Sequence, residues 1–312
     1  MSNAEQVRGL KIVNAPQGWA HQEQANRIAA LTGGTLVAKP IPGDTDLYYP
    51  FFVDDTKDGS ALLLDGIEPF IPVSAILVAL DKREQAKLFK ANGVPTPETY
   101  LVDTLDKVGE FLEAHQDHEW ILKYPTLNET RGHQVVSRPE EFRALREKDI
   151  FGKLEWPAPY IVQRFHRREV PEVFRAYCVD GNVFAWNVRR FPEGVPPKDL
   201  VAHLVGALYY QLGTPPQDVQ DLTTQALKAV GLYDSFGVID FIKAEEADPE
   251  SNDLGPWRVI EVNTDGFDFI VDRGIAVERF ADGTERNDTA FVDELDGRIA
   301  QAVQKKIAAT SR

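Results

Sequence analysis

Oxygen-bearing side chains interrupt two short apolar segments in the last third of the chain. Gly237–Phe241 reads Gly-Val-Ile-Asp-Phe, and Trp257–Thr264 reads Trp-Arg-Val-Ile-Glu-Val-Asn-Thr. Their β-branched residues predict buried strands, in which a carboxylate is costly unless a partner compensates for its lost hydration. Glu261 and Asn263 are two apart and share a face, and with Asp240 they offer only hard oxygen ligands. Mg²⁺ takes this donor set when it also holds nucleotide phosphates. Two edge strands with solvated acids are the alternative interpretation.

The order of apolar periods and turn residues divides the chain into three predicted units, 1–80, 81–158 and 159–312. Residues 1–80 are expected to form a small α/β domain. Its expected strands are 11–15, 35–38 and 61–64, and its expected helix is 22–31. The loop 14–18, which contains Pro and Gly, follows the first strand, where such sheets usually hold a ligand. Turn geometry alone explains that loop equally well.

Residues 81–312 mix predicted helices and strands. Helices are expected over 81–92, 105–114, 139–145, 200–212, 219–230 and 291–308. Strands are expected at 120–124, 134–136 and 160–165, after an extended segment at 94–102. The stretch 174–188 has the pattern of a hairpin around the turn Asp180–Asn182, and 237–241 and 257–264 are expected to pair as antiparallel strands.

Composition narrows the class of protein. A chain of 312 residues with 43% hydrophobic residues can form two or three lobes with real cores. The net charge of −15 argues against a nucleic-acid or anionic-membrane partner, because no basic surplus exists. The single cysteine, Cys178, excludes an intrachain disulfide and favours core packing. The histidines lack metal-ligand spacing, and only His166 and His203 stand out. With no leader-like or membrane-spanning segment, a cytoplasmic protein is expected.

Taken in order, these segments resemble the ATP-grasp superfamily, the fold of D-alanine–D-alanine ligase, glutathione synthetase and the glutamate ligases that extend peptide termini. The resemblance runs from about 81 to 272. Its motifs are Asp81-Lys82, Gly93-Val-Pro-Thr-Pro97, Ile121-Leu-Lys-Tyr124, Val162-Gln-Arg-Phe165, Phe174-Arg175, Gly237-Val-Ile-Asp240 and Glu261-Val-Asn263. Each motif alone is weak, whereas five or six in order are fairly specific. The resemblance implies an α/β (α+β) fold: a small N-terminal α/β domain and two ATP-grasp subdomains that clasp the nucleotide.

The resemblance also implies which residues bind ATP. Lys82 and Lys123 are expected to reach the nucleotide phosphates, and Lys123 ends an apolar strand, where a pocket suits its ammonium better than open water. An ordinary surface lysine and a strand-end lysine that snorkels to water are the alternatives. Gln163 and Phe165 are expected at the hinge beside the adenine. Glu172 is expected near the ribose hydroxyls, although its spacing to Arg175 is one residue off the common pattern.

Arginines on the two arms of the predicted hairpin are the candidate catalytic residues. A guanidinium fork suits pairs of phosphoryl or carboxylate oxygens. Arg190 follows an alternating strand and is expected, together with Arg175, to contact the transferred phosphoryl or the acyl phosphate. Arg189 is then expected on the opposite face, where simple solvation is a sufficient role.

Two stretches depart from the family's pattern. The loop 128–133 contains one glycine where relatives have several, so either Arg131 replaces backbone contacts with charge or the lid closes less tightly. The segment 126–132 is expected to be mobile without nucleotide and ordered with it. After Asn263, Asp265-Gly-Phe267 stands where many relatives have Ser-Pro-Gly. Asp265 or Asp268 then contacts an amine substrate or only shapes the turn.

The chemistry implied by the resemblance is ATP-dependent ligation of a carboxylate to an amine through an acyl phosphate, with release of ADP and phosphate. Two Mg²⁺ ions held by Asp240, Glu261 and Asn263 would neutralise charge on the phosphates. The expected substrates are amino acids or peptides, and a homodimer is left open. Alternatives are a small-molecule kinase on the same fold, an ATP-binding protein without turnover and, apart from the resemblance, a Mg²⁺-dependent phosphohydrolase.

Overall fold

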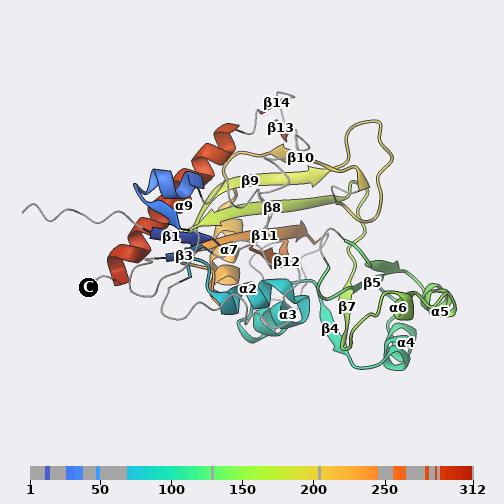
Figure 1. The fold of residues 1–312 in the computed structure, drawn as a ribbon. Coiled ribbons are helices and arrows are strands. Elements are labelled where there is room, and N and C mark those ends of the chain that lie inside the picture. Colours follow the sequence, from blue (N-terminus) through green and yellow to red (C-terminus); the bar gives the residue numbers. More distant parts are fainter. Residues whose placement is uncertain are drawn as a thin grey trace, which may run out of the picture.

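The computed structural model describes residues 11–14, 26–37, 47–49, 69–127, 130–202, 205–244, 256–264, 278–280, 285–286 and 289–310. Three sheets organise this part of the chain (Figure 1). The first is parallel, in the order β2-β1-β3, and consists of β1 (Lys11–Asn14), β2 (Thr35–Val37) and β3 (Leu47–Tyr49). Residues 26–31 are helical, as expected. The predicted strand at 61–64 lies outside the described residues, and β3 was not predicted.

Two helices follow, separated only by Asp81. They are α2 (Val73–Leu80) and α3 (Lys82–Ala91), and the Asp81 carboxylate caps α3 by accepting the Arg83 N–H at 2.9 Å. The structure confirms α3. It adds α2, whose sequence is apolar nearly all round, so periodicity does not distinguish it from a buried strand.

The second sheet is antiparallel, in the order β4-β7-β5-β6. Its strands are β4 (Thr99–Val102), β5 (Trp120–Lys123), β6 (Gln134–Val136) and β7 (Tyr160–Arg164). One face is covered by α4 (Leu105–Ala114), α5 (Pro139–Glu147) and α6 (Ile150–Lys153), with Trp120, Leu122 and Val162 buried beneath them. The alternate residues of β5 and β7 therefore point to the opposite face.

The third sheet is the largest, in the order β12-β11-β8-β9-β10-β13-β14. Its strands are β8 (Glu172–Val179), β9 (Asn182–Arg190), β10 (Leu208–Gln211), β11 (Phe236–Lys243), β12 (Trp257–Asn263), β13 (Glu278–Phe280) and β14 (Glu285–Arg286). The helices α7 (Gln217–Val230) and α9 (Thr289–Thr310) pack on this sheet (Figure 1) and contribute to its core. Cys178 is buried in that core. The predicted hairpin is confirmed as β8–β9.

The predicted helix over 200–212 is wrong. Its second half forms β10, which pairs with β9 so that Tyr209 lies opposite Arg189. Gly206 has a φ of 98°, a left-handed conformation that interrupts a helix, and the two tyrosines that follow favour a strand that fits against β9. None of the helices in the described ranges is long and apolar enough to cross a membrane.

Candidate functional site

Asp240, Glu261 and Asn263 project from two neighbouring strands of the large sheet. In the β11–β12 pairing Asp240 lies directly opposite Glu261, and Asn263 lies opposite Val238. Residues that face each other across a ladder share a face, as do residues two apart on one strand. Asp240 is 2% exposed, and Asn263 Nδ2 lies 3.4 Å from Glu261 Oε1. The register therefore brings the three oxygen-bearing side chains to one place.

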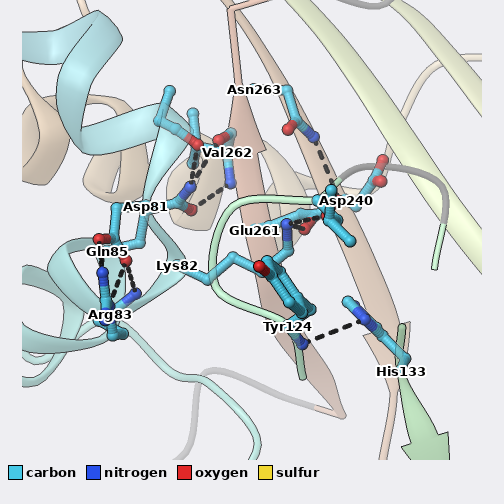
Figure 2. Close-up of polar contacts among 12 residues, drawn as sticks. Asp81, Lys82, Arg83, Gln85, Tyr124, His133, Asp240, Glu261, Val262 and Asn263 are labelled. Carbon is cyan, nitrogen blue, oxygen red and sulfur yellow. Dashed lines mark hydrogen bonds and ion pairs between the residues drawn. The ribbon is translucent and has the colours of Figure 1, made fainter. Parts of the chain in front are cut away.

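Helix α3 brings Lys82 to the same place. The Lys82 ammonium lies 3.4 Å from Glu261 Oε2 (Figure 2). It also donates to the Leu127 carbonyl at 2.9 Å. Gln85, almost one turn further along α3, fixes the helix on edge strand β12. Its amide donates to the Val262 carbonyl at 3.0 Å and accepts the Val262 N–H at 2.7 Å. Sequence reasoning missed Gln85, because its partner lies 177 residues away along the chain.

Lys123, at the end of β5, belongs to the same group of charges. Its side chain is buried, and burial lowers the pKa of its ammonium to about 8 against the opposing effect of the Glu261 carboxylate. For Lys123 the effect of burial on the pKa is larger than that of nearby charges, whereas for Glu261 the nearby charges have the larger effect. Burial alone raises its pKa, but the charges of Lys82 and Lys123 outweigh burial and hold that pKa well below the usual range of a glutamate. Glu261 is therefore ionised at neutral pH, and most Lys123 side chains are protonated.

His133 is a further member of the group that was not singled out as a site residue. Its Nδ1 accepts the Tyr124 N–H at 3.4 Å (Figure 2). Burial, followed by the charges of Lys82 and Lys123, lowers the pKa of His133 to about 3. The imidazole is therefore neutral at neutral pH, and with Nδ1 as the acceptor its proton lies on Nε2. The imidazole also hydrogen-bonds to the Arg131 backbone, so a phosphate oxygen beside the two lysines would have to replace that partner.

Two buried arginines surround the Asp240 carboxylate. Arg175 binds both oxygens, through Nε at 2.6 Å and an η nitrogen at 2.8 Å, and Arg189 donates to one oxygen at 3.1 Å. Arg175 lies directly opposite Asp240 in the β8–β11 pairing. Tyr209 lies beside both arginines, with its hydroxyl 3.4 Å from Arg175 and 3.3 Å from Arg189.

The sides expected for Arg189 and Arg190 are reversed. Arg190 lies opposite Glu172 in the β8–β9 register, with 3.5 Å between their charged groups, and its guanidinium lies 4.6 Å from the centre of the Tyr210 ring. Arg190 and Glu172 thus occupy the face opposite to Asp240. The alternation of side chains was visible in the sequence, but the register that decides which arginine faces Asp240 was not.

The remaining predicted residues lie around this centre. Gln163 shares a face of the small sheet with Lys123 and donates to the Thr99 hydroxyl at 2.9 Å. Phe165 follows β7 directly, and Arg131 is exposed in the turn that precedes β6. Gly132 has a φ of 77°, and a Cβ there would lie 3.2 Å from Tyr124 Cβ. Residues 128 and 129, His203, Asp265 and Asp268 lie outside the described part of the chain.

Asp240, Glu261 and Asn263 are chemically suitable ligands for Mg²⁺, but both carboxylates are paired with lysine or arginine side chains in the structure. Among the residues that the structure describes, no three His, Cys, Asp or Glu side chains form a metal cluster. Two carboxylates and one amide remain a suitable set, because Mg²⁺ commonly keeps several waters and substrate phosphates as its other ligands. Asp240, Glu261 and Asn263 would hold the ion, and the cations now paired with both carboxylates would have to give way.

Comparison with known proteins supports the fold. No protein-family model matches the sequence, and a search of curated proteins finds no match. Solved structures do match over nearly the whole chain. A D-cycloserine synthetase shares 16% identity at a TM-score of 0.62, covering 96% of this chain and 99% of that one. D-alanine–D-alanine ligase from Bacillus anthracis shares 13% at 0.59, covering 96% and 98%. The ATP-grasp ligase PsnB, complexed with a minimal precursor, Mg and ADP, shares 16% at 0.60, covering 96% and 97%. The chain therefore has the ATP-grasp fold, as its sequence motifs predicted.

Proposed function

We propose that this protein is an ATP-dependent ligase that joins a carboxylate to an amine. The observation that carries the proposal is the convergence of Lys82, Lys123 and Glu261. These residues come from α3, the small sheet and the large sheet, and they act on one another electrostatically in a buried site. Two lysines beside a carboxylate and its oxygen-bearing neighbours match the needs of a magnesium–triphosphate group.

In the proposed reaction, a carboxylate oxygen of the first substrate attacks the γ-phosphorus of ATP, and the bond from that phosphorus to ADP breaks. The amine of the second substrate then attacks the acyl carbon, and phosphate leaves with the oxygen that had been part of the carboxylate. Mg²⁺, when bound, supplies charge neutralisation on the phosphate oxygens. No protein nucleophile is needed, so the side chains act by position and charge.

The roles of individual residues follow from where they lie. Lys82 and Lys123 would hold phosphate oxygens, and the neutral His133 would donate to another through Nε2. Asp240, Glu261 and Asn263 would hold Mg²⁺, and Gln163 with Phe165 would border the adenine. Arg131 would approach the phosphates from the lid. Arg175 would contact the transferred phosphoryl, whereas Glu172, which pairs with Arg190 on the face opposite to Asp240, has no part in the proposed site.

The test is a screen for ADP release with pairs of carboxylates and amines. The structural neighbours include a D-alanine–D-alanine ligase and a ligase complexed with a precursor peptide, so the screen should contain free amino acids and short peptides. ADP release that requires both partners supports the ligase. A hydroxyl acceptor that suffices alone supports the kinase. Tight Mg²⁺–nucleotide binding with no ADP formed across the screen supports a binding protein, and the last two outcomes each overturn the proposal.

A further inference from the structure

The Asp240 carboxylate is shared unequally between its two arginines. Arg175 makes two bonds to it, at 2.6 and 2.8 Å, whereas Arg189 makes one, at 3.1 Å. A carboxylate has about four acceptor positions, and three are used here. Two buried guanidinium groups against one carboxylate leave a net positive charge, so a third cation at Asp240 would have to displace one of them. Because Arg189 has a single, longer bond to Asp240, it is the arginine that such a cation would displace.

Arg189 is also incompletely hydrogen-bonded. The arginine is 7% exposed, and its Nε has no hydrogen-bond partner among the described residues. A buried donor without a partner carries a desolvation cost that an incoming acceptor would remove. Arg189 therefore neutralises Asp240 in this position, and its Nε–H remains available to donate a hydrogen bond to an anion.

Tyr209 contacts Arg189 and could hold its guanidinium if the bond to Asp240 breaks. It lies directly opposite Arg189 in the β9–β10 pairing and is 9% exposed. Its hydroxyl lies 3.3 Å from one η nitrogen of Arg189, and the guanidinium carbon lies 5.3 Å from the ring centre. These contacts do not involve Asp240, so they can persist when the bond to Asp240 breaks.

We propose that Arg189 is an exchangeable counterion, which neutralises Asp240 in the nucleotide-free protein and turns to the γ-phosphoryl group when Mg²⁺ reaches Asp240. Tyr209 is the positioning residue that holds Arg189 in both states. This proposal rests on the proposed function, because it takes Asp240 as a metal ligand. It assigns to Arg189 the phosphoryl contact that the sequence favours for Arg190.

The test uses nucleotide binding without turnover. We would titrate Mg²⁺ against the full chain in the presence of ADP, and then compare the affinities of ADP and of an ATP analogue with an imido-linked γ-phosphate. For Arg189→Gln, we expect half-saturation with ADP at a lower Mg²⁺ concentration, because a competitor for Asp240 is gone. We also expect the preference for the analogue over ADP to fall roughly ten- to hundredfold, the effect of losing a hydrogen bond from a charged group.

The comparison variants give the result its meaning. Tyr209→Phe keeps the ring and should lower the same preference by a smaller factor, whereas Tyr210→Phe, on the other face, should not. Arg190→Gln should affect the preference less than Arg189→Gln. A structural defect would weaken Mg²⁺ and both nucleotides together, so tighter Mg²⁺ with a lost preference separates exchange from misfolding. If Arg189→Gln does not fold, Tyr209→Phe alone decides.

Three results would overturn the exchange while leaving the proposed function intact: weaker Mg²⁺ binding in an Arg189→Gln variant that folds as the wild type does, an unchanged analogue preference, or a larger loss of that preference in Arg190→Gln. If the wild-type protein binds no nucleotide in a Mg²⁺-dependent way, the proposed function fails and the exchange fails with it.

Discussion

Lys123 is the residue whose environment gives the clearest pH dependence. Its pKa is lowered to about 8, chiefly by burial, and a bound triphosphate would raise it again. The protonated lysine that phosphate needs is therefore present below about pH 8 and lost above it. We expect ATP affinity to be constant below that pH and to fall by up to about tenfold per pH unit above it.

Calorimetry checks this directly, because binding above the pKa must take up a proton and the measured heat then depends on the buffer. Lys123→Met should bind weakly at every pH and show no proton uptake. Lys87→Met is the control, since that exposed lysine pairs with Glu84 at 2.7 Å on the surface of α3. A wild-type affinity that is flat through pH 9 would remove Lys123 from the phosphate site.

Glu261 tests the metal assignment. Glu261→Gln keeps the volume of the side chain but loses its charge, so the fold should remain while Mg²⁺-dependent nucleotide binding weakens and most turnover is lost. The loss should be at least as large as the roughly 10- to 100-fold that removal of an outer-shell partner costs a metal site. Glu84→Gln, on the exposed side of α3, should bind as the wild type does. Unchanged Mg²⁺ dependence in Glu261→Gln would contradict the assignment.

The site residues that could be predicted from the sequence are those whose position within their own strand makes them stand out. Asp240, Glu261 and Lys123 end or interrupt apolar runs, and such positions are visible in one dimension. Sequence reasoning missed Gln85 and Tyr209, because the role of each depends on contacts with another strand, and the sequence alone does not report those contacts. Arg189 was predicted on the wrong face of the sheet for the same reason, because the register between two strands decides which arginine lies beside Asp240.

At the scale of elements, the contact of α3 with β12 sets the distance from Lys82 to Glu261. Gln85→Met has a similar volume but cannot bond Val262, whose buried N–H loses its partner. We expect the free energy of unfolding to fall by roughly 1–3 kcal/mol, and ATP affinity to fall because Lys82 is no longer fixed. Chemical denaturation and calorimetry measure the two effects.

Gln225→Met is the matched control, because its amide makes two solvent-exposed bonds to the end of the same helix. It should change stability by about 0.5 kcal/mol or less and leave nucleotide affinity unaltered. If Gln85→Met keeps full ATP affinity, α3 is not what positions Lys82.

The segment 126–132, expected to act as a lid, is the second element with a direct test. Arg131 is exposed, and its proposed role is to reach the phosphates when nucleotide binds. Arg131→Gln should therefore lower ATP affinity, whereas Arg143→Gln, which removes an exposed arginine paired with Glu140, should not. If Arg131 serves only in a surface ion pair, its loss should change affinity almost not at all, because such pairs contribute about 0–1 kcal/mol. Protease sensitivity of 126–132 that is equal with and without the analogue would show a fixed turn.

Elements with strong local signals were predictable. The helix at 105–114 matches α4, with Thr104 as its cap, and the turn at Asp180 and Gly181 has the left-handed φ values that a tight hairpin requires. The stretch 200–212 was misassigned because apolar residues without a clear period fit a helix or a strand. Pairing with β9, which no local signal reports, decided between them.

At the scale of the molecule, the candidate site concentrates positive charge in an acidic protein. Lys82, Lys123, Arg175 and Arg189 gather where the two sheets meet, although the whole chain carries −15. Outside the candidate site, Arg167 pairs with Glu119, just before β5 of the second sheet, and with Asp199, between β9 and β10 of the third. These groups are partly exposed, so the two ion pairs contribute little to stability.

We propose that the candidate site makes an acyl phosphate from ATP and a carboxylate. The most direct test supplies the carboxylate substrate found in the ADP-release screen with ¹⁸O in both carboxylate oxygens, together with the amine, Mg²⁺ and unlabelled ATP. Mass spectrometry of the released phosphate then reports where the transferred oxygen came from. The account predicts one ¹⁸O atom in each phosphate and one in the amide product. Phosphate that carries no ¹⁸O would mean that water or another acceptor attacks ATP, and would contradict the account.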